Sequence, residues 1–185
     1  MFKKLLTMLA AVFTVLVITG CEAINEVQYK PEYVLTFYQH VQYPGNSKKI
    51  EKEITDPRNN QTYWVNSNQF FDSSSIMEVK MFPVEGEPNM YTLAFKLDRS
   101  GTSRWTSLCG HSRAVKIIIM VDGEFYTIYQ QAMDVIDDDN NSNDIWVNCS
   151  AQFDILTAKG IMSHAQQNYK YFHPDINNWW FDKSK

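Results

Sequence analysis

Residues 115–129 read VKIIIMVDGEFYTIY, and this stretch decides the fold. An apolar run of mostly β-branched residues leads to Asp122-Gly123, and a second run rich in aromatic and β-branched residues follows it. Asp-Gly between two such runs is the strongest short signal for a two-residue hairpin turn. We therefore predict antiparallel strands over 115–121 and 124–129.

Further strands are expected on both sides of this hairpin. Segments that are rich in β-branched and aromatic residues, or that alternate in polarity, predict strands over 33–41, 63–65, 76–82, 90–97 and 145–153. Turn residues at 85–88 join two of these strands into a second hairpin. Residues 45–62 are polar and carry turn signals, and we expect turns there.

Two helices are predicted between these strands. The first covers residues 98–110, and either Ser100 or Thr102 can cap it. The second begins at Asp154 or Thr157 and runs to about residue 168.

A short helical turn is also expected at 72–75, where polar residues can cap it. The order of elements is then strand, short helix, hairpin, helix, hairpin, strand, helix. This order predicts an α+β fold, a mainly antiparallel sheet with two helices packed on one face.

The first twenty residues have the three parts of an export signal. Lys3 and Lys4 precede an apolar run over 5–18, and small residues precede Cys21 in the sequence Ile18-Thr19-Gly20-Cys21. This is the bacterial lipoprotein box, in which the cysteine accepts a diacylglycerol. We predict that residues 1–20 are the signal peptide and that Cys21 becomes the lipidated amino terminus. The alternative is an ordinary secreted protein with a chance cysteine.

The predicted anchor sets the expected organisation and location. A buried methylene contributes about 0.8 kcal/mol, so palmitate-like chains on Cys21 would hold the protein stably on a membrane. Residues 21–32 form a short polar tether, and residues 33–185 form a single domain of ordinary size. We expect the bacterial cell envelope. Aspartate after the cysteine is the usual signal for inner-membrane retention, and Glu22 at this position leaves both membranes open; we favour the outer membrane, facing the periplasm.

The charge balance argues against nucleic acid as a partner. Removal of the signal takes Lys3 and Lys4 from the 17 basic residues and none of the 21 acidic ones, which changes the net charge from −4 to −6. An acidic chain is repelled by phosphate backbones and by anionic lipid headgroups.

The cysteines predict one disulfide. The chain has three cysteines, and lipidation of Cys21 leaves the pair Cys109 and Cys149. An even pair in an oxidising compartment favours a bridge, and it would stabilise the fold by about 3–4 kcal/mol. The alternative is two buried free thiols.

Four segments resemble the head subdomain of the first periplasmic domain of SecD, a subunit of the bacterial protein-export machinery. They are Gln61–Ile76, Tyr91–Thr106, Val115–Gly123 and Phe153–Ala165, which follow the strand and helix pattern of that subdomain. The chain departs from the family at Ile128-Tyr129-Gln130-Gln131 and at Ser150-Ala151. The resemblance implies a similar fold and a grip on extended polypeptide. It implies no transport activity, because the membrane helices that couple SecD to the proton gradient are absent.

Two stretches could bind a metal, and in both we favour a structural interpretation. Cys109-Gly110-His111 is better explained as a helix end beside a disulfide cysteine, since zinc needs about four suitably spaced ligands. Residues 137–144, with four aspartates and three asparagines, lack the glycine and glutamate positions of a calcium loop. We expect a solvated acidic loop there and no metal or other cofactor.

The C-terminal residues Trp179, Trp180 and Phe181 are the candidate partner-binding residues. Aromatic residues are enriched in interface cores, and tryptophan also suits the membrane interface. The alternative is that the three rings pack onto their own domain.

Three functional hypotheses fit these features. The first is a protein-binding or peptide-binding module that takes an extended segment along an open sheet edge. The second is a structural component of an envelope complex that docks through the C-terminal aromatics. The third, an enzyme, would need a deep polar pocket, and the sequence carries none of the common catalytic motifs.

Overall fold

The computed structural model describes residues 29–45, 49–111, 116–130, 135–136 and 146–176. Of residues 108–111, 135–136 and 176 only the backbone is described. The chain divides into two compact units, Met1–Lys30 and Pro31–Lys185. The predicted signal peptide and Cys21 lie outside the described residues, and every described helix and strand belongs to the second unit.

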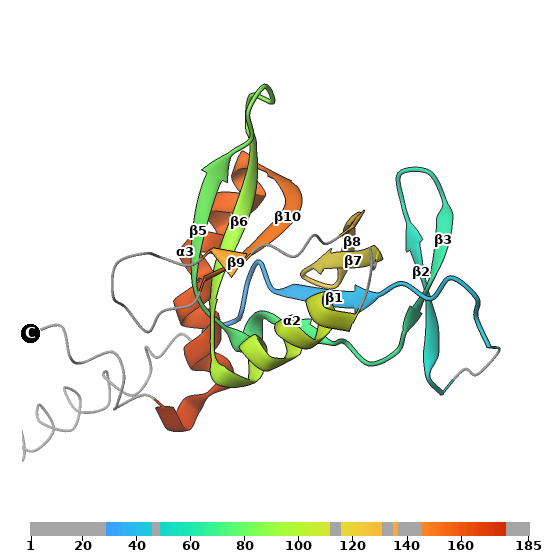
Figure 1. Ribbon diagram of the computed structural model, residues 1–185. Coiled ribbons are helices and arrows are strands. Elements are labelled where there is room, and N and C mark those ends of the chain that lie inside the picture. The colour runs from blue at the N-terminus through green and yellow to red at the C-terminus, as the bar shows by residue number, and fades with distance from the viewer. Residues whose placement is uncertain (1–28, 46–48, 112–115, 131–134, 137–145, 177–185) are drawn as a thin grey trace, which may run out of the picture. The chain divides into compact units, whose positions relative to one another are not determined.

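Two four-stranded antiparallel sheets make up most of the second unit (Figure 1). The first has the order β4 (Phe71–Asp72), β1 (Leu35–Gln39), β7 (Lys116–Val121), β8 (Glu124–Gln130). The second has the order β5 (Ile76–Pro83), β6 (Met90–Leu97), β10 (Trp146–Asp154), β9 (Val135–Ile136). The predicted α+β class with antiparallel strands is confirmed, and the strands that we expected in one sheet are divided between two.

The β7–β8 hairpin forms as predicted. Asp122 and Gly123 both have positive φ, at 52° and 84°, which is the backbone of a type I′ turn. The Asp122 carboxylate also accepts hydrogen bonds from the backbone N–H groups of Tyr33 and Val34, at 3.1 and 2.8 Å. The turn therefore fixes the start of β1 as well as the hairpin.

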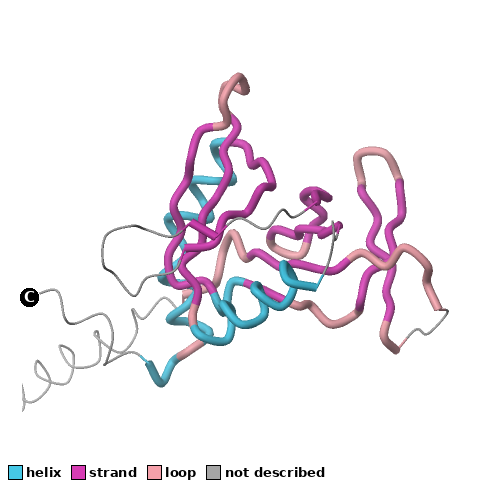
Figure 2. The backbone as a smooth tube through the Cα atoms, viewed as in Figure 1, coloured by secondary structure: helices cyan, strands magenta, loops and turns pink. Residues whose placement is uncertain are grey.

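The expectation of turns alone over 45–62 was wrong. Strands β2 (Glu51–Asp56) and β3 (Gln61–Asn66) pair in antiparallel register and form a two-stranded ribbon, visible apart from the sheets in Figure 2. The turn between them contains Asn59-Asn60, and Asn60 has a φ of 56°. Strand β2 has no apolar face of its own, and it is held in place by its pairing with β3.

Two α-helices and two short 3-10 turns complete the described part of the unit. They are η1 (Ser73–Ser75), α2 (Arg99–His111), α3 (Ile155–Phe172) and η2 (Pro174–Ile176). Asp98, not Ser100 or Thr102, caps α2, because its carboxylate accepts the Gly101 N–H at 2.6 Å. Of the two caps predicted for α3, Asp154 is the one used; it accepts hydrogen bonds from the N–H groups of Leu156 and Thr157.

One large core joins both sheets and both helices. At its centre Phe37, Phe71, Phe95 and Trp105 have ring centroids 5.1–6.3 Å apart, and all four rings are buried. Helix α3 packs mainly against β5, and it contributes Ala158, Ile161 and Ala165 to the core. The ribbon takes no part in this core.

Candidate functional site

The ribbon lies against the outer face of the first sheet, where a second and much smaller apolar cluster forms. Its buried members are Ile54, Val65 and Ile118, one each from β2, β3 and β7. Around them lie half-buried side chains, namely Tyr38, Tyr63, Met120, Phe125 and Ile128. These side chains keep part of their apolar surface in contact with solvent, which leaves it free for a ligand.

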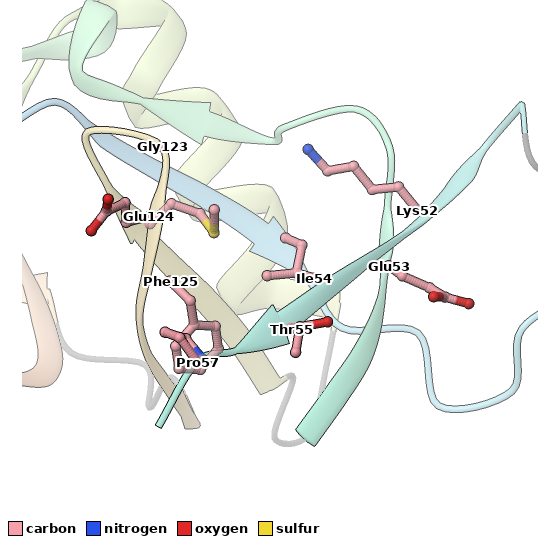
Figure 3. A pocket seen from close by; sticks show the side chains of 9 residues that line it. Lys52, Glu53, Ile54, Thr55, Pro57, Gly123, Glu124 and Phe125 are labelled. Atoms are coloured by element: carbon pink, nitrogen blue, oxygen red, sulfur yellow. The ribbon is translucent and has the colours of Figure 1, made fainter. Parts of the chain in front are cut away.

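Two open hollows lie between the ribbon and the β7–β8 hairpin, and we call the pair the ribbon trough. The first has a volume of about 520 Å³ (Figure 3). It is lined by residues 52–55 of β2, by Pro57 just after that strand, and by Met120 and residues 123–125 of the hairpin. The second, of about 310 Å³, is lined by Gln61, Tyr63, Lys116, Ile128, Tyr129 and Gln130. The trough thus follows β8 from its first residues to its last.

A stacked ring pair stands between the two hollows. The rings of Tyr63 and Phe125 are nearly parallel, at 6°, with centroids 5.8 Å apart. The Arg58 guanidinium lies 5.3 Å from the Phe125 centroid, on the edge of the cation–π range. Two hydrogen bonds of 2.9 and 3.0 Å to the Asp56 carboxylate hold that guanidinium, and they lower the pKa of Asp56 even though burial acts to raise it.

Each hollow also carries a cation. In the first, the Lys52 ammonium lies 3.7 Å from the centroid of the Tyr38 ring. In the second, the cation is Lys116. Its backbone carbonyl also accepts a hydrogen bond of 3.0 Å from the backbone N–H of His40. Burial, and next the charge of Lys116, lower the pKa of His40. His40 is therefore held in its neutral form at neutral pH.

Strand β8 is the last strand of its sheet in the part of the chain that the structure describes, and its sequence differs from those of the edge strands β5 and β2. Natural sheet edges are protected by charge, by proline or by a covering helix. Strand β5 carries Glu78, Lys80 and Pro83 and lies against α3, and β2 carries three charged residues at its start. From Phe125 to Tyr129, β8 has neither a charge nor a proline.

Strand β10 of the other sheet approaches β8 without pairing with it. The Tyr126 hydroxyl accepts the Asp154 N–H and donates to its carboxylate, both at 2.9 Å, and the Tyr126 ring stacks on Phe153. The Cys149 thiol lies 3.4 Å from the Tyr129 hydroxyl. Tyr126 and Tyr129 thus pack against the large core, and Tyr129 also lines the second hollow of the ribbon trough.

The structure describes few of the residues that the sequence marked as candidates. Trp179, Trp180, Phe181 and the acidic loop 137–144 lie outside the described residues, as do the side chains of Cys109 and His111. Cys149 is a buried free cysteine, and burial raises the pKa of its thiol to about 11. The disulfide between Cys109 and Cys149 stays a prediction. Among the described side chains, no three His, Cys, Asp or Glu residues lie close enough to hold a metal ion.

The residues of the ribbon trough were not predicted as a site. The signal that could have found them was Tyr63-Trp64-Val65, a strand too short to stand alone, which requires a pairing partner nearby.

The comparisons leave the family open. No protein-family model matches the chain, and no curated protein matches it. Within the described residues, no helix has the length and apolarity that crossing a bilayer requires.

Proposed function

We propose that this protein is a lipid-anchored component of the bacterial envelope that binds an extended segment of polypeptide in the ribbon trough, along β8. It would act as a binding or assembly module without transport activity of its own. The lipoprotein box at Cys21 and the resemblance to the SecD head support this proposal from the sequence.

One observation carries the proposal: two hollows flank a stacked ring pair beside β8, which carries neither charge nor proline from Phe125 to Tyr129. An extended peptide repeats its side chains every second residue on one face, so two of them can enter hollows that lie at the two ends of β8. Main-chain hydrogen bonds to β8 would supply affinity, and contact with the half-buried rings would supply selectivity.

The test uses a permanently unfolded probe, reduced and carboxymethylated α-lactalbumin with a fluorescent label. Titration with the full acylated protein in detergent should raise the anisotropy of the probe. Phe125→Ala removes one ring of the stacked pair and should weaken binding about tenfold, since truncation of a central aromatic residue costs at least 1–2 kcal/mol at an interface.

A matched ring elsewhere provides the control. Phe82 is 42% exposed near the end of β5, away from the ribbon trough, and Phe82→Ala should leave binding unchanged. Absence of probe binding by the wild type, or equal affinities of the two folded variants, would contradict the proposal.

A separate variant tests whether the edge of β8 takes part in binding. Thr127→Lys places a charge in the middle of the edge of β8, where charge prevents strand addition, and should abolish binding. Thr106→Lys makes the same change on an exposed position of α2 and should have no effect. Circular dichroism of each variant checks that the fold survives. Binding retained by a folded Thr127→Lys protein would exclude pairing with β8.

A further inference from the structure

The last turn of α3 exposes two large rings. Tyr171 is 47% exposed and Phe172 is 38% exposed, and their rings meet edge to face at 5.4 Å. Both follow Lys170 directly in sequence. Aromatic side chains next to a lysine are typical of membrane–water interfaces, where the rings lie at headgroup level.

The start of the second unit runs along the same face of α3. The Tyr33 ring lies over Gly160, where a Cβ atom would come within 2.3 Å of it, and it packs against His164 with centroids 5.3 Å apart. One residue earlier, the carbonyl of Glu32 accepts a hydrogen bond of 2.8 Å from the Asn168 side chain, which is almost fully buried.

These contacts fix the start of the second unit along α3. Tyr33 contacts Gly160 and His164, whereas Glu32 contacts His164 through its carboxylate, at 3.7 Å, and Asn168 through its backbone carbonyl. Positions three and four residues after Asn168 are Tyr171 and Phe172, which lie on the same helix face one turn further on. The first residues of the second unit therefore lie on the face of α3 that carries the exposed rings one turn further on.

We propose that Tyr171 and Phe172 rest in the headgroup layer of the bilayer that holds the acylated Cys21. This inference rests on the lipid anchor of the proposed function. The chain between Cys21 and Glu32 spans at most about 36 Å when extended. The surface beside Glu32 is thus the part of the folded unit held nearest to the lipid.

The test places a photoreactive residue at the rings. Full-length acylated protein carrying Phe172→p-benzoylphenylalanine is reconstituted in vesicles of phosphatidylethanolamine and phosphatidylglycerol, and adducts are identified by intact mass after illumination. Phospholipid adducts should form at position 172 at least fivefold more than with the same residue at Tyr43 or Phe82, which are 82% and 42% exposed. A second probe at Tyr171 repeats the test if the first variant fails to fold.

Equal lipid adducts at all positions, or only protein–protein adducts at 172, would overturn the membrane contact while leaving probe binding in the ribbon trough untouched. The same mass spectra report whether Cys21 carries acyl chains. An unacylated amino terminus would remove the anchor, and with it both this inference and the location in the proposed function.

Discussion

The two apolar clusters of the unit differ in how completely they bury their rings. In the large core, Phe37 contacts Phe70, Phe71, Phe95 and Trp105, and its own surface is fully buried. On the ribbon side, Tyr63 and Phe125 stack on each other and are only half-buried. A ring whose whole surface contacts its neighbours contributes to stability alone. A half-buried ring keeps apolar surface for a ligand, which is why the proposed binding site is on the ribbon side.

Truncation of one ring in each cluster should give the largest difference in stability between the two clusters. Phe37→Ala should lower the free energy of unfolding by about 3–5 kcal/mol, since it leaves a cavity among packed rings. Phe125→Ala should lower it by only about 1–2 kcal/mol, because less apolar area leaves contact with the protein. Urea unfolding of both variants measures the difference. Equal losses would show that the ribbon side is as tightly packed as the core.

The sequence predicted the core side well because its strands have strong local patterns. Runs such as Ile117–Ile119, together with the Asp122-Gly123 turn, give strand and connection at once, and β6 begins and ends where its pattern predicted. The helix 98–110 was placed correctly, although Asp98 caps it.

The ribbon escaped prediction for a physical reason. Strand β2 reads Glu-Lys-Glu-Ile-Thr-Asp, in which Ile54 is the sole apolar residue, so no alternating pattern exists in it. Its order comes from β3 and from contact with the β7–β8 hairpin, which is distant in sequence. The ribbon trough arises from this packing of distant segments, which local sequence patterns do not predict.

The cap of α3 belongs to the core side and should have the next largest effect. Asp154→Ala removes the hydrogen bonds to the first turn and to Tyr126, and should lower the free energy of unfolding by about 1–2 kcal/mol. Asp154→Asn keeps part of the cap and should cost less.

The same carboxylate gives a pH dependence. Burial acts to raise the pKa of Asp154, but hydrogen bonds, above all from Thr157, outweigh it and lower the pKa below its ordinary 3.8. The stabilisation is therefore complete above about pH 4 and is lost as the pH falls further. An Asp154→Ala protein that melts like the wild type near neutral pH would contradict the role of the cap.

Two adjacent isoleucines of β7 allow the same substitution to be compared in the two apolar clusters. Ile119 points into the large core and Ile118 into the ribbon-side cluster, and both are fully buried. Loss of one methyl group typically costs about 0.5–1.5 kcal/mol. For Ile119→Val we expect a loss of stability near the upper end of this range. For Ile118→Val we expect a loss near the lower end, because the ribbon can move to fill the space left by the methyl group. Thermal melts of the pair decide this, and a larger loss for Ile118→Val would reverse the comparison.

His40 gives the smallest expected effect. Its pKa is lowered in the folded protein, first by burial and then by Lys116, so the unfolded chain takes up the proton more readily. Stability should be flat above about pH 6.5 and should decline as the pH falls below that value. His40→Asn should flatten this part of the profile, as measured by urea midpoints at about pH 8 and about pH 5. An unchanged slope in the variant would assign the decline to other groups.

Hydrogen exchange of the full acylated protein, with and without saturating unfolded α-lactalbumin, tests the central claim most directly. If polypeptide binds in the ribbon trough along β8, the amides of residues 124–130 and 61–66 should exchange more slowly with the probe present, while those of the protected edge strand 76–83 should not change. Protection of 76–83 instead, or no protection of 124–130 at saturation, would contradict the account.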